Sequence, residues 1–263
     1  MRLYAISDLH TDFRENRAAL ERAGLAGHRN DALIVAGDVA DGEATIRDTL
    51  EWLAVRFAEV FFVPGNHELW VRGEPRDSME KFRAVLRLCD QAGVRTEPAR
   101  VGGAWVVPLF SWYHPDFDVR GEGVEEELEA WSDRYFCRWP ANLGRIDEAF
   151  LEMNEARVHR YDAPVITFSH FVPRPELLPR VHNLRFKGLP LVAGSLGIEA
   201  QIRRIQPRVH VFGHTHIPAD RVIDGVRYVQ NYFRRPVEGS VRTSPLKLVW
   251  APGDDAFATP RFC

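Results

Sequence analysis

Five short motifs in the chain combine carboxylate, carboxamide and imidazole side chains. Such side chains bind divalent transition metals through oxygen and nitrogen, and here each motif follows a short apolar run. The motifs are Asp8-Leu9-His10, Gly37-Asp38-Val39-Ala40-Asp41, Gly65-Asn66-His67-Glu68, Ser169-His170 and Gly213-His214-Thr215-His216. Because long stretches of sequence separate the motifs, the fold must bring them together. Polar residues gathered from several strand ends are typical of an active site.

The apolar runs before the motifs predict buried strands. Each run is short, rich in β-branched or aromatic residues, and followed by Gly, Pro, Ser or Asn. The predicted strands are residues 3–6, 32–36, 60–63, 165–168 and 209–212. Between the first three strands, residues 15–23 and 44–57 have helical character, and the second of these stretches has apolar residues at three- and four-residue spacing. The order strand, helix, strand predicts parallel pairing and a layered α/β fold, in which ligands bind beyond the carboxyl ends of the strands.

In their types and order, the motifs resemble those of the calcineurin-like metallophosphoesterase superfamily, from residue 8 to residue 216. The most specific of them is Gly65-Asn66-His67-Glu68, which fixes four consecutive residue types. The resemblance implies a four-layer α/β fold, in which two mixed β-sheets pack face to face between outer helices. It also implies a dinuclear metal centre at one end of this sandwich.

The resemblance further assigns the metal ligands. One ion would be bound by Asp8, His10 and His216, the other by Asn66, His170 and His214, and Asp38 would bridge the two. Mixed oxygen and nitrogen ligation suits Mn, Fe, Zn or Co, as divalent or mixed-valence ions, and does not choose among them. Two such ions about 3.5–4 Å apart would lower the pKa of a bridging water, so that hydroxide attacks phosphorus near neutral pH.

His67 is the candidate general acid for the departing oxygen, a role worth about 10²–10⁴ in rate. The resemblance makes Asp41 the carboxylate that orients its imidazole. The alternative for Asp8, Asp38 and Asn66 is an ordinary turn or helix N-cap role, but five motifs in the family's order favour ligands. Glu68 is interpreted as structural, and His210 as a packed core residue.

Two departures from the protein Ser/Thr phosphatases of the superfamily affect the substrate prediction. Where those enzymes carry phosphate-binding arginines, this chain has Gly42 and Pro64. Other side chains must therefore contact the phosphate, and the candidates are Tyr113, His114, Arg185 and Lys187. For His114 the alternative is packing against Trp112, and for Arg185 it is a solvated loop charge.

The remaining sequence predicts a single domain, residues 1–263, with one helical insertion at residues 116–160. The aromatic residues of the insertion either pack its helices down or form a cap over the metals. Residues 173–194 are predicted to form an irregular loop, and residues 104–110 a strand. The alternating residues 221–229 and 246–250, around Asp224-Gly225, predict a hairpin that ends the second sheet.

Composition narrows the function classes. A chain of 263 residues with 45% hydrophobic residues can bury one sizeable core. No run approaches the roughly 20 apolar residues of a membrane span, and no signal peptide is visible, so a cytoplasmic protein is expected. Three widely spaced cysteines, Cys89, Cys137 and Cys263, suit reduced thiols.

The predicted function is metal-dependent hydrolysis of a phosphate mono- or diester. The expected partner is a small phosphorylated substrate, with nucleotides among the candidates, and the sequence does not indicate an oligomeric state. A nuclease of the same superfamily is one alternative, but it would need a basic groove, and the net charge is −3. A non-enzymatic scaffold is the alternative from another class, since fold does not imply function. The complete ligand set together with His67 and Asp41 favours an enzyme.

Overall fold

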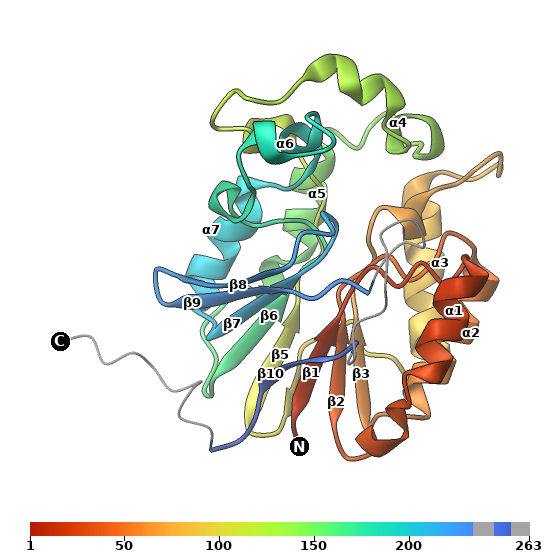
Figure 1. Cartoon of the computed structure of the whole chain (residues 1–263), viewed down its shortest axis with the longest axis vertical. Helices are drawn as coiled ribbons and strands as arrows, with labels where there is room; N and C mark the ends of the chain where they lie inside the picture. Colours follow the sequence, from red (N-terminus) through yellow and green to blue (C-terminus); the bar gives the residue numbers. More distant parts are fainter. Residues whose placement is uncertain (234–244, 254–263) are drawn as a thin grey trace.

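Two mixed β-sheets form the centre of the computed structural model, and helices cover their outer faces (Figure 1). The structure describes residues 1–233 and 245–253. The first sheet contains β1 (Leu3–Ile6), β2 (Ala32–Val35), β3 (Glu59–Phe62) and β10 (Lys247–Trp250). The second contains β4 (Ala99–Val101), β5 (Ala104–Pro108), β6 (Val165–Phe168), β7 (Val209–Phe212), β8 (Ala219–Ile223) and β9 (Val226–Gln230). The predicted α/β sandwich of two mixed sheets between helices is confirmed.

In the first sheet, the strand order is β10-β1-β2-β3, and β1, β2 and β3 are parallel as predicted. The assignment of residues 246–250 to a hairpin of the second sheet was wrong, because β10 pairs antiparallel with β1. Alternation shows that a strand is half-buried, but it does not identify the neighbouring strand. Val249 and Trp250 of β10 join the core between the sheets.

In the second sheet, the order is β4-β5-β6-β7-β9-β8, with parallel pairs from β5 to β9 and antiparallel pairs at both edges. The predicted turn at Asp224-Gly225 is confirmed, and it joins β8 to β9. Both turn residues have positive φ, 47° and 80°, which suits the tight turns that connect twisted antiparallel strands.

Seven α-helices lie among the described residues. They are α1 (Arg14–Arg22), α2 (Glu43–Ala54), α3 (Ser78–Gln91), α4 (Asp133–Phe136), α5 (Ile146–Met153), α6 (Leu189–Val192) and α7 (Leu196–Ile205). The 3₁₀ helices are η1 (Leu25–His28), η2 (His67–Leu69), η3 (Pro115–Phe117), η4 (Glu125–Ala130), η5 (Glu155–Arg157), η6 (Pro175–Leu177) and η7 (Val181–Asn183). Helix α2 ends earlier than predicted because the chain turns at residues 55–58 to enter β3. None of the helices in the described parts is long and apolar enough to cross a bilayer.

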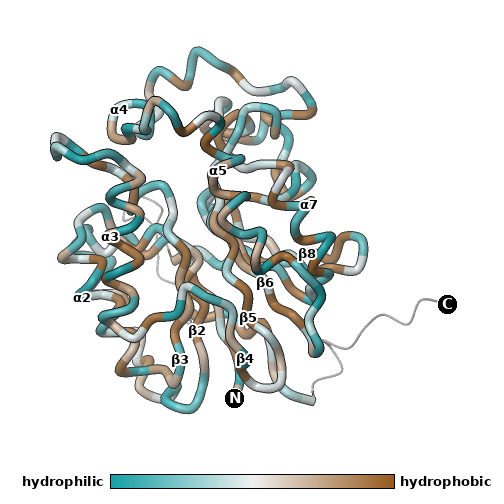
Figure 2. The backbone as a smooth tube through the Cα atoms, turned by 180° about the vertical axis from the view of Figure 1, so that it is seen from behind, coloured by the Kyte–Doolittle hydropathy of each residue, from teal (hydrophilic) through white to brown (hydrophobic). Residues whose placement is uncertain are grey.

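The side chains of the first sheet alternate between two hydrophobic clusters. Leu3, Ile34 and Phe61 face the second sheet, whereas Leu33 and Phe62 face the helical layer that contains α1, α2 and α3. This alternation follows from the two-residue period of a strand. Figure 2 shows hydrophobic segments along the strands and many hydrophilic segments in the outer helices and loops.

Residues 116–160, predicted to form a helical insertion, contain the short helices α4 and α5 together with 3₁₀ helices and turns. Gly121, Gly123, Pro140 and Gly144 interrupt the segment, and such residues end helices. The segment arches over one end of the molecule toward α3 (Figure 1). There, hydrogen bonds attach it to the loop after η2, as Val71 N donates to Phe136 O at 2.7 Å. The predicted single domain also includes residues 234–244 and 254–263, which lie outside the described residues.

Candidate metal centre

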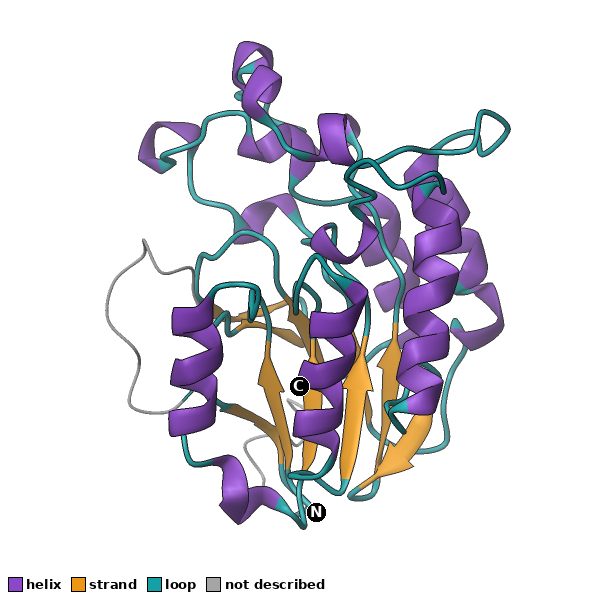
Figure 3. Ribbon diagram, turned by 90° about the vertical axis from the view of Figure 1, so that its right-hand side faces the viewer, coloured by secondary structure: helices purple, strands orange, loops and turns teal. Residues whose placement is uncertain are grey.

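The five motifs follow the carboxyl ends of β1, β2, β3, β6 and β7. Figure 3 shows several neighbouring strands whose arrowheads point toward the same end of the molecule, where loops connect them to helices. Three of the five strands belong to the first sheet and two to the second, so the site spans both sheets. Backbone hydrogen bonds join the motif loops directly. Asp8 N donates to Gly37 O at 3.0 Å, and Gly213 N donates to His170 O at 2.9 Å. The separate strand ends therefore form one connected site.

Close backbone approach makes this assembly possible. A Cβ at Gly37 would lie 2.3 Å from His170 Nδ1, and a Cβ at Gly65 would lie 2.2 Å from Asp38 Oδ1. Five of the seven predicted ligands also have positive φ, a conformation rarely adopted by residues other than glycine. They are Asp8, His10, Asp38, His214 and His216. Such strain is concentrated at functional sites, where the surrounding structure maintains it.

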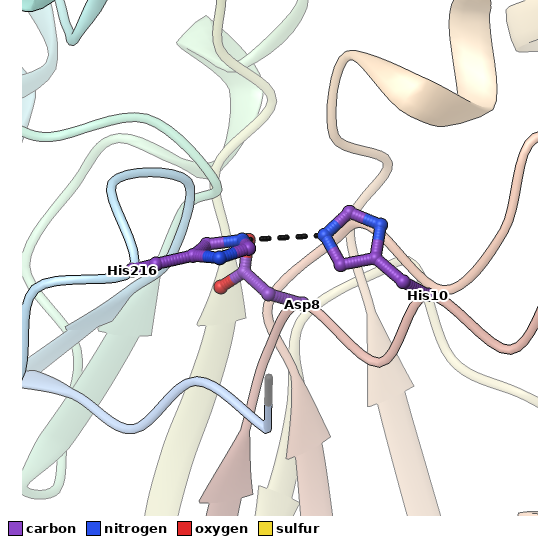
Figure 4. A group of neighbouring side chains, drawn as sticks. All are labelled: Asp8, His10 and His216. Carbon is purple, nitrogen blue, oxygen red and sulfur yellow. Dashed lines mark hydrogen bonds and ion pairs between the residues drawn. The ribbon is translucent and has the colours of Figure 1, made fainter. Parts of the chain in front are cut away.

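One group of donor atoms comes from Asp8, His10 and His216 (Figure 4). His10 Nε2 lies 3.2 Å from His216 Nε2, which lies 3.3 Å from Asp8 Oδ1. Burial alone would raise the pKa of the Asp8 carboxyl, but the neighbouring histidines, His216 foremost, hold it well below its usual value. Asp8 is therefore a carboxylate, as a metal ligand must be.

A second group comes from Asn66, His170 and His214. Asn66 Oδ1 lies 3.2 Å from His170 Nε2 and 3.1 Å from His214 Nδ1. Asp38 lies between the two groups, because its Oδ2 is 3.5 Å from His170 Nε2 and 4.0 Å from His10 Nε2. The structure thus brings all seven predicted ligands together in the arrangement expected of two sites that share one carboxylate.

The hydrogen bonds of the second group test whether it suits a cation. His170 Nδ1 lies 2.9 Å from Ala36 O and His214 Nε2 lies 3.0 Å from Val192 O, and since a carbonyl only accepts, both outer nitrogens donate. Burial lowers the pKa of both imidazoles, so the rings are neutral and their inner nitrogens carry lone pairs. Those lone pairs face another acceptor, Asn66 Oδ1. Lone pairs that point at one another repel unless a cation lies between them. The three side chains therefore suit a metal ion as its ligands.

His67 and Asp41 stand beside this centre. His67 Nδ1 lies 2.7 Å from Asp41 Oδ1, and His67 Nε2 lies 4.0 Å from Asp38 Oδ2. The indole of Trp70 packs on the imidazole with ring centroids 3.7 Å apart. Arg72 Nη2 forms an ion pair with Asp41 Oδ2 at 2.7 Å. The imidazole is therefore fixed on two sides, with Nε2 directed toward the shared carboxylate.

Glu68 shows how the second and third motifs are connected. Its buried carboxylate accepts backbone hydrogen bonds from Gly65 at 2.7 Å, Asp38 at 3.0 Å, Val39 at 2.6 Å and Ala40 at 3.2 Å. Burial raises the pKa of Glu68 to about 7, against the effect of these donors. The residue has the structural role that the sequence predicted, since it holds the loops of Asp38 and Asn66 together.

The four predicted substrate residues are placed differently. The ring of Tyr113 stacks beside His214 with centroids 6.5 Å apart. Burial raises the pKa of the Tyr113 hydroxyl well above its usual value. His114 Nδ1 accepts a hydrogen bond from Asp116 N at 3.2 Å and so caps η3. Arg185 and Lys187 are exposed, on either side of a phenylalanine that stacks on Trp131. Only Tyr113 of the four packs against a candidate ligand among the described contacts.

Three residues of the site were missed by sequence reasoning: Asp133, Trp70 and Lys81. Asp133 accepts a hydrogen bond from Asn66 Nδ2 at 2.9 Å. Lys81 is buried in α3, and its ammonium donates to the backbone carbonyls of Asp41 and Trp70, while burial lowers its pKa. No motif marks these residues. A buried lysine on the apolar face of a helix was the one available signal.

A family model described as calcineurin-like phosphoesterase matches residues 1–218 of the chain. The chain belongs to this family. The resemblance inferred from the five motifs is thereby confirmed. Metallophosphoesterases of the family use divalent metal ions, and the donor groups of this chain suit such ions.

Two comparisons with known members agree with the family match. The chain is similar to the acyl-carrier-protein phosphodiesterase PptH of Mycobacterium tuberculosis, with 33% identity over 251 residues, which cover 86% of this chain and 75% of the relative. It also aligns with the crystal structure of phosphopantetheinyl hydrolase (PptH) from Mycobacterium tuberculosis. That alignment has a TM-score of 0.77 and 27% identity and covers 96% of this chain and 98% of the other. Family and relative together support a hydrolase of phosphate esters.

Proposed function

We propose that the protein is a metal-dependent phosphodiesterase, and that its substrate is the phosphodiester that joins a phosphopantetheinyl group to a carrier protein. The observation that supports the chemistry is that two groups of candidate metal ligands meet at Asp38, beside the His67–Asp41 pair. The observation that supports the substrate is the similarity to PptH, which spans 86% of the chain. Family membership alone does not decide whether the substrate is a phosphomonoester or a phosphodiester, so this proposal is more specific than the family match.

Asp8, His10 and His216 would bind one ion, and Asn66, His170 and His214 the other, with Asp38 bridging. When bound, two cations would lower the pKa of a coordinated water and neutralise charge on the phosphoryl oxygens. The protein holds its ligands before any ion arrives. Backbone carbonyls orient His170 and His214, and Glu68 fixes the loops of Asp38 and Asn66.

His67 would act as general acid through Nε2. Asp41 accepts the Nδ1 proton in a hydrogen bond, so the ring keeps the orientation in which Nε2 faces the site. An alkoxide is a poor leaving group, and the cleavage of an alkyl phosphodiester therefore requires proton donation to the departing oxygen. His67, oriented by Asp41, would donate this proton.

The missing arginines also favour a diester. A phosphodiester carries less negative charge than a monoester, so it needs fewer cationic contacts besides the metals. Gly42 and Pro64 stand where the protein phosphatases have arginines. We assign contacts with the rest of the substrate to Tyr113, His114, Arg185 and Lys187. Tyr113 packs beside His214, whereas segment 182–187 is connected to His214 indirectly, because Phe186 stacks on Trp131 and Trp131 packs against His214.

The test is hydrolysis by the purified, Mn²⁺-loaded protein of three substrates: a holo carrier protein, bis-p-nitrophenyl phosphate and p-nitrophenyl phosphate. We expect loss of the phosphopantetheinyl group in intact-mass spectra and cleavage of the aryl diester. Cleavage of the monoester alone would contradict a diesterase. Cleavage of the aryl diester without the holo carrier protein would contradict the substrate assignment. Nicking of plasmid DNA at low salt would favour a nuclease instead.

A further inference from the structure

Asp133 is a buried carboxylate that the insertion places against the candidate metal centre. The residue is only 3% exposed. Oδ1 accepts hydrogen bonds from Asn66 Nδ2 at 2.9 Å and Trp70 Nε1 at 2.6 Å, and Oδ2 accepts one from Trp131 Nε1 at 3.0 Å. Asp133 is therefore an acceptor surrounded by donors, and one of those donors belongs to a candidate ligand.

The Asn66 amide could take two orientations that differ by a half-turn about its last bond. In the structure, Oδ1 faces His170 Nε2 and His214 Nδ1, and Nδ2 faces Asp133. In the reverse orientation, the Asn66 amino group would donate to both imidazole nitrogens and present no oxygen to an ion. Without a cation, that reverse orientation satisfies the two histidines better.

The hydrogen bonds of Asp133 oppose the reverse orientation. After a half-turn, Asn66 Oδ1 would lie against Asp133 Oδ1, and two buried oxygen acceptors that close repel each other. The loss of the Asn66–Asp133 hydrogen bond would also leave a buried acceptor with one donor fewer. The geometry therefore selects the amide orientation that a metal requires.

We propose that Asp133 is a positioning residue, which holds the Asn66 oxygen toward the second ion and thereby couples metal binding to residues 116–160. The proposal rests on the proposed function, because it presumes that an ion binds at Asn66, His170 and His214. It adds a residue that lies outside all five motifs. Removal of a group that orients a metal ligand typically weakens metal binding about 10–100-fold.

The test is calorimetric titration of the metal-free protein with Mn²⁺. In Asp133→Asn, the new amide can donate to a reversed Asn66 oxygen, so we expect the second ion to bind about 10–100-fold more weakly and the first ion to be unaffected. Asp118→Asn is the matched control. Asp118 belongs to the same insertion and accepts backbone bonds from Glu122 and Gly123, so its loss should loosen the insertion without changing Mn²⁺ binding.

A rescue variant separates positioning from packing. In the double variant Asn66→Asp/Asp133→Asn the hydrogen bond is reversed, since the new amide at position 133 would donate to the new carboxylate at position 66. That carboxylate presents an oxygen to the ion in either orientation. We expect the double variant to bind two ions more tightly than Asp133→Asn does. Failure of the rescue, or equal losses in Asp118→Asn and Asp133→Asn, would overturn the proposal.

A measurement on the unaltered protein covers the case in which Asp133→Asn fails to fold. The side-chain amide protons of Asn66 should exchange with solvent far more slowly than those of the exposed Asn142, in the absence of metal. Equal exchange rates would show that Asp133 does not hold the amide. Unchanged binding of two ions in folded Asp133→Asn would refute the inference alone, whereas absence of a second ion from the wild type would refute the proposed function as well.

Discussion

Gly65 of the third motif lies so close to Asp38 and His170 that it leaves no room for a side chain. A Cβ at this position would lie 2.2 Å from Asp38 Oδ1 and 2.7 Å from His170 Nε2. Both distances are far shorter than van der Waals contact, and the crowded atoms are candidate ligand atoms on two different motifs. The Gly65→Ala substitution therefore tests how closely the motif loops must approach.

Two effects are expected from Gly65→Ala. An added methyl group in a packed interior costs about 1–3 kcal/mol of unfolding free energy, because neighbours must leave their preferred positions. The neighbour most directly displaced is Asp38, whose carboxylate lies between the two donor groups. Binding of both ions should therefore weaken, in contrast with a change that affects a single site.

Urea unfolding of the metal-free protein measures the first effect, and Mn²⁺ titration measures the second. Gly27→Ala is the matched control, because a Cβ at Gly27 would meet nothing within 4 Å. This control should leave Mn²⁺ binding unchanged and leave stability unchanged or raised by about 0.4–1 kcal/mol. If folded Gly65→Ala matches Gly27→Ala in both assays, neither stability nor metal binding requires the close approach of Gly65 to Asp38 and His170.

Four further substitutions test separate parts of the structure. His67→Ala should keep both ions and lose about 10²–10⁴ in kcat on an alkyl diester, but much less on bis-p-nitrophenyl phosphate, whose leaving group needs no proton. Asp38→Asn should lose metal and activity together. Loss of both ions in His67→Ala with their retention in Asp38→Asn would contradict these roles. Burial lowers the pKa of His210 to about 3, so its neutral form stabilises the fold above pH 6.5, the ordinary histidine pKa, and this stability is lost as pH falls from 6.5 toward 3. His210→Gln should therefore lose less unfolding free energy than wild type between pH 7 and pH 4, and parallel losses would refute the assignment. Arg185→Ala should lower kcat/KM by about 10-fold with unchanged metal content, if a lost charged hydrogen bond costs about 1.5 kcal/mol; wild-type kinetics would make Arg185 a solvated loop charge.

The layered α/β fold and the positions of the five motifs could be predicted from sequence because their signals are local, whereas the two-sheet sandwich and the seven candidate ligands were implied by the resemblance to the family. Each apolar run ends beside its own motif, as at Asp8 and His214, and the parallel strands then bring those ends to one edge. The close approaches at Gly37 and Gly65 could not be foreseen in this way. They depend on the packing of loops from different strands.

Pairings between distant segments escaped prediction because they have no sequence period. The alternation of β10 is as compatible with the second sheet as with β1, and only the backbone pairing seen in the structure, antiparallel to β1, decides between them. Asp133 is 67 positions from Asn66 and appears in the sequence as one more acidic residue of the insertion. Its hydrogen bonds with Asn66, Trp70 and Trp131 depend on tertiary packing, which has no local signal in the sequence.

Anomalous diffraction from crystals of the Mn²⁺-loaded protein would test the dinuclear centre most directly. We expect two peaks about 3.5–4 Å apart, as in other two-metal sites. One should lie at Asp8, His10 and His216, and the other at Asn66, His170 and His214, with Asp38 between them. A single peak, or peaks bound by other residues, would contradict the dinuclear centre on which the proposed function depends.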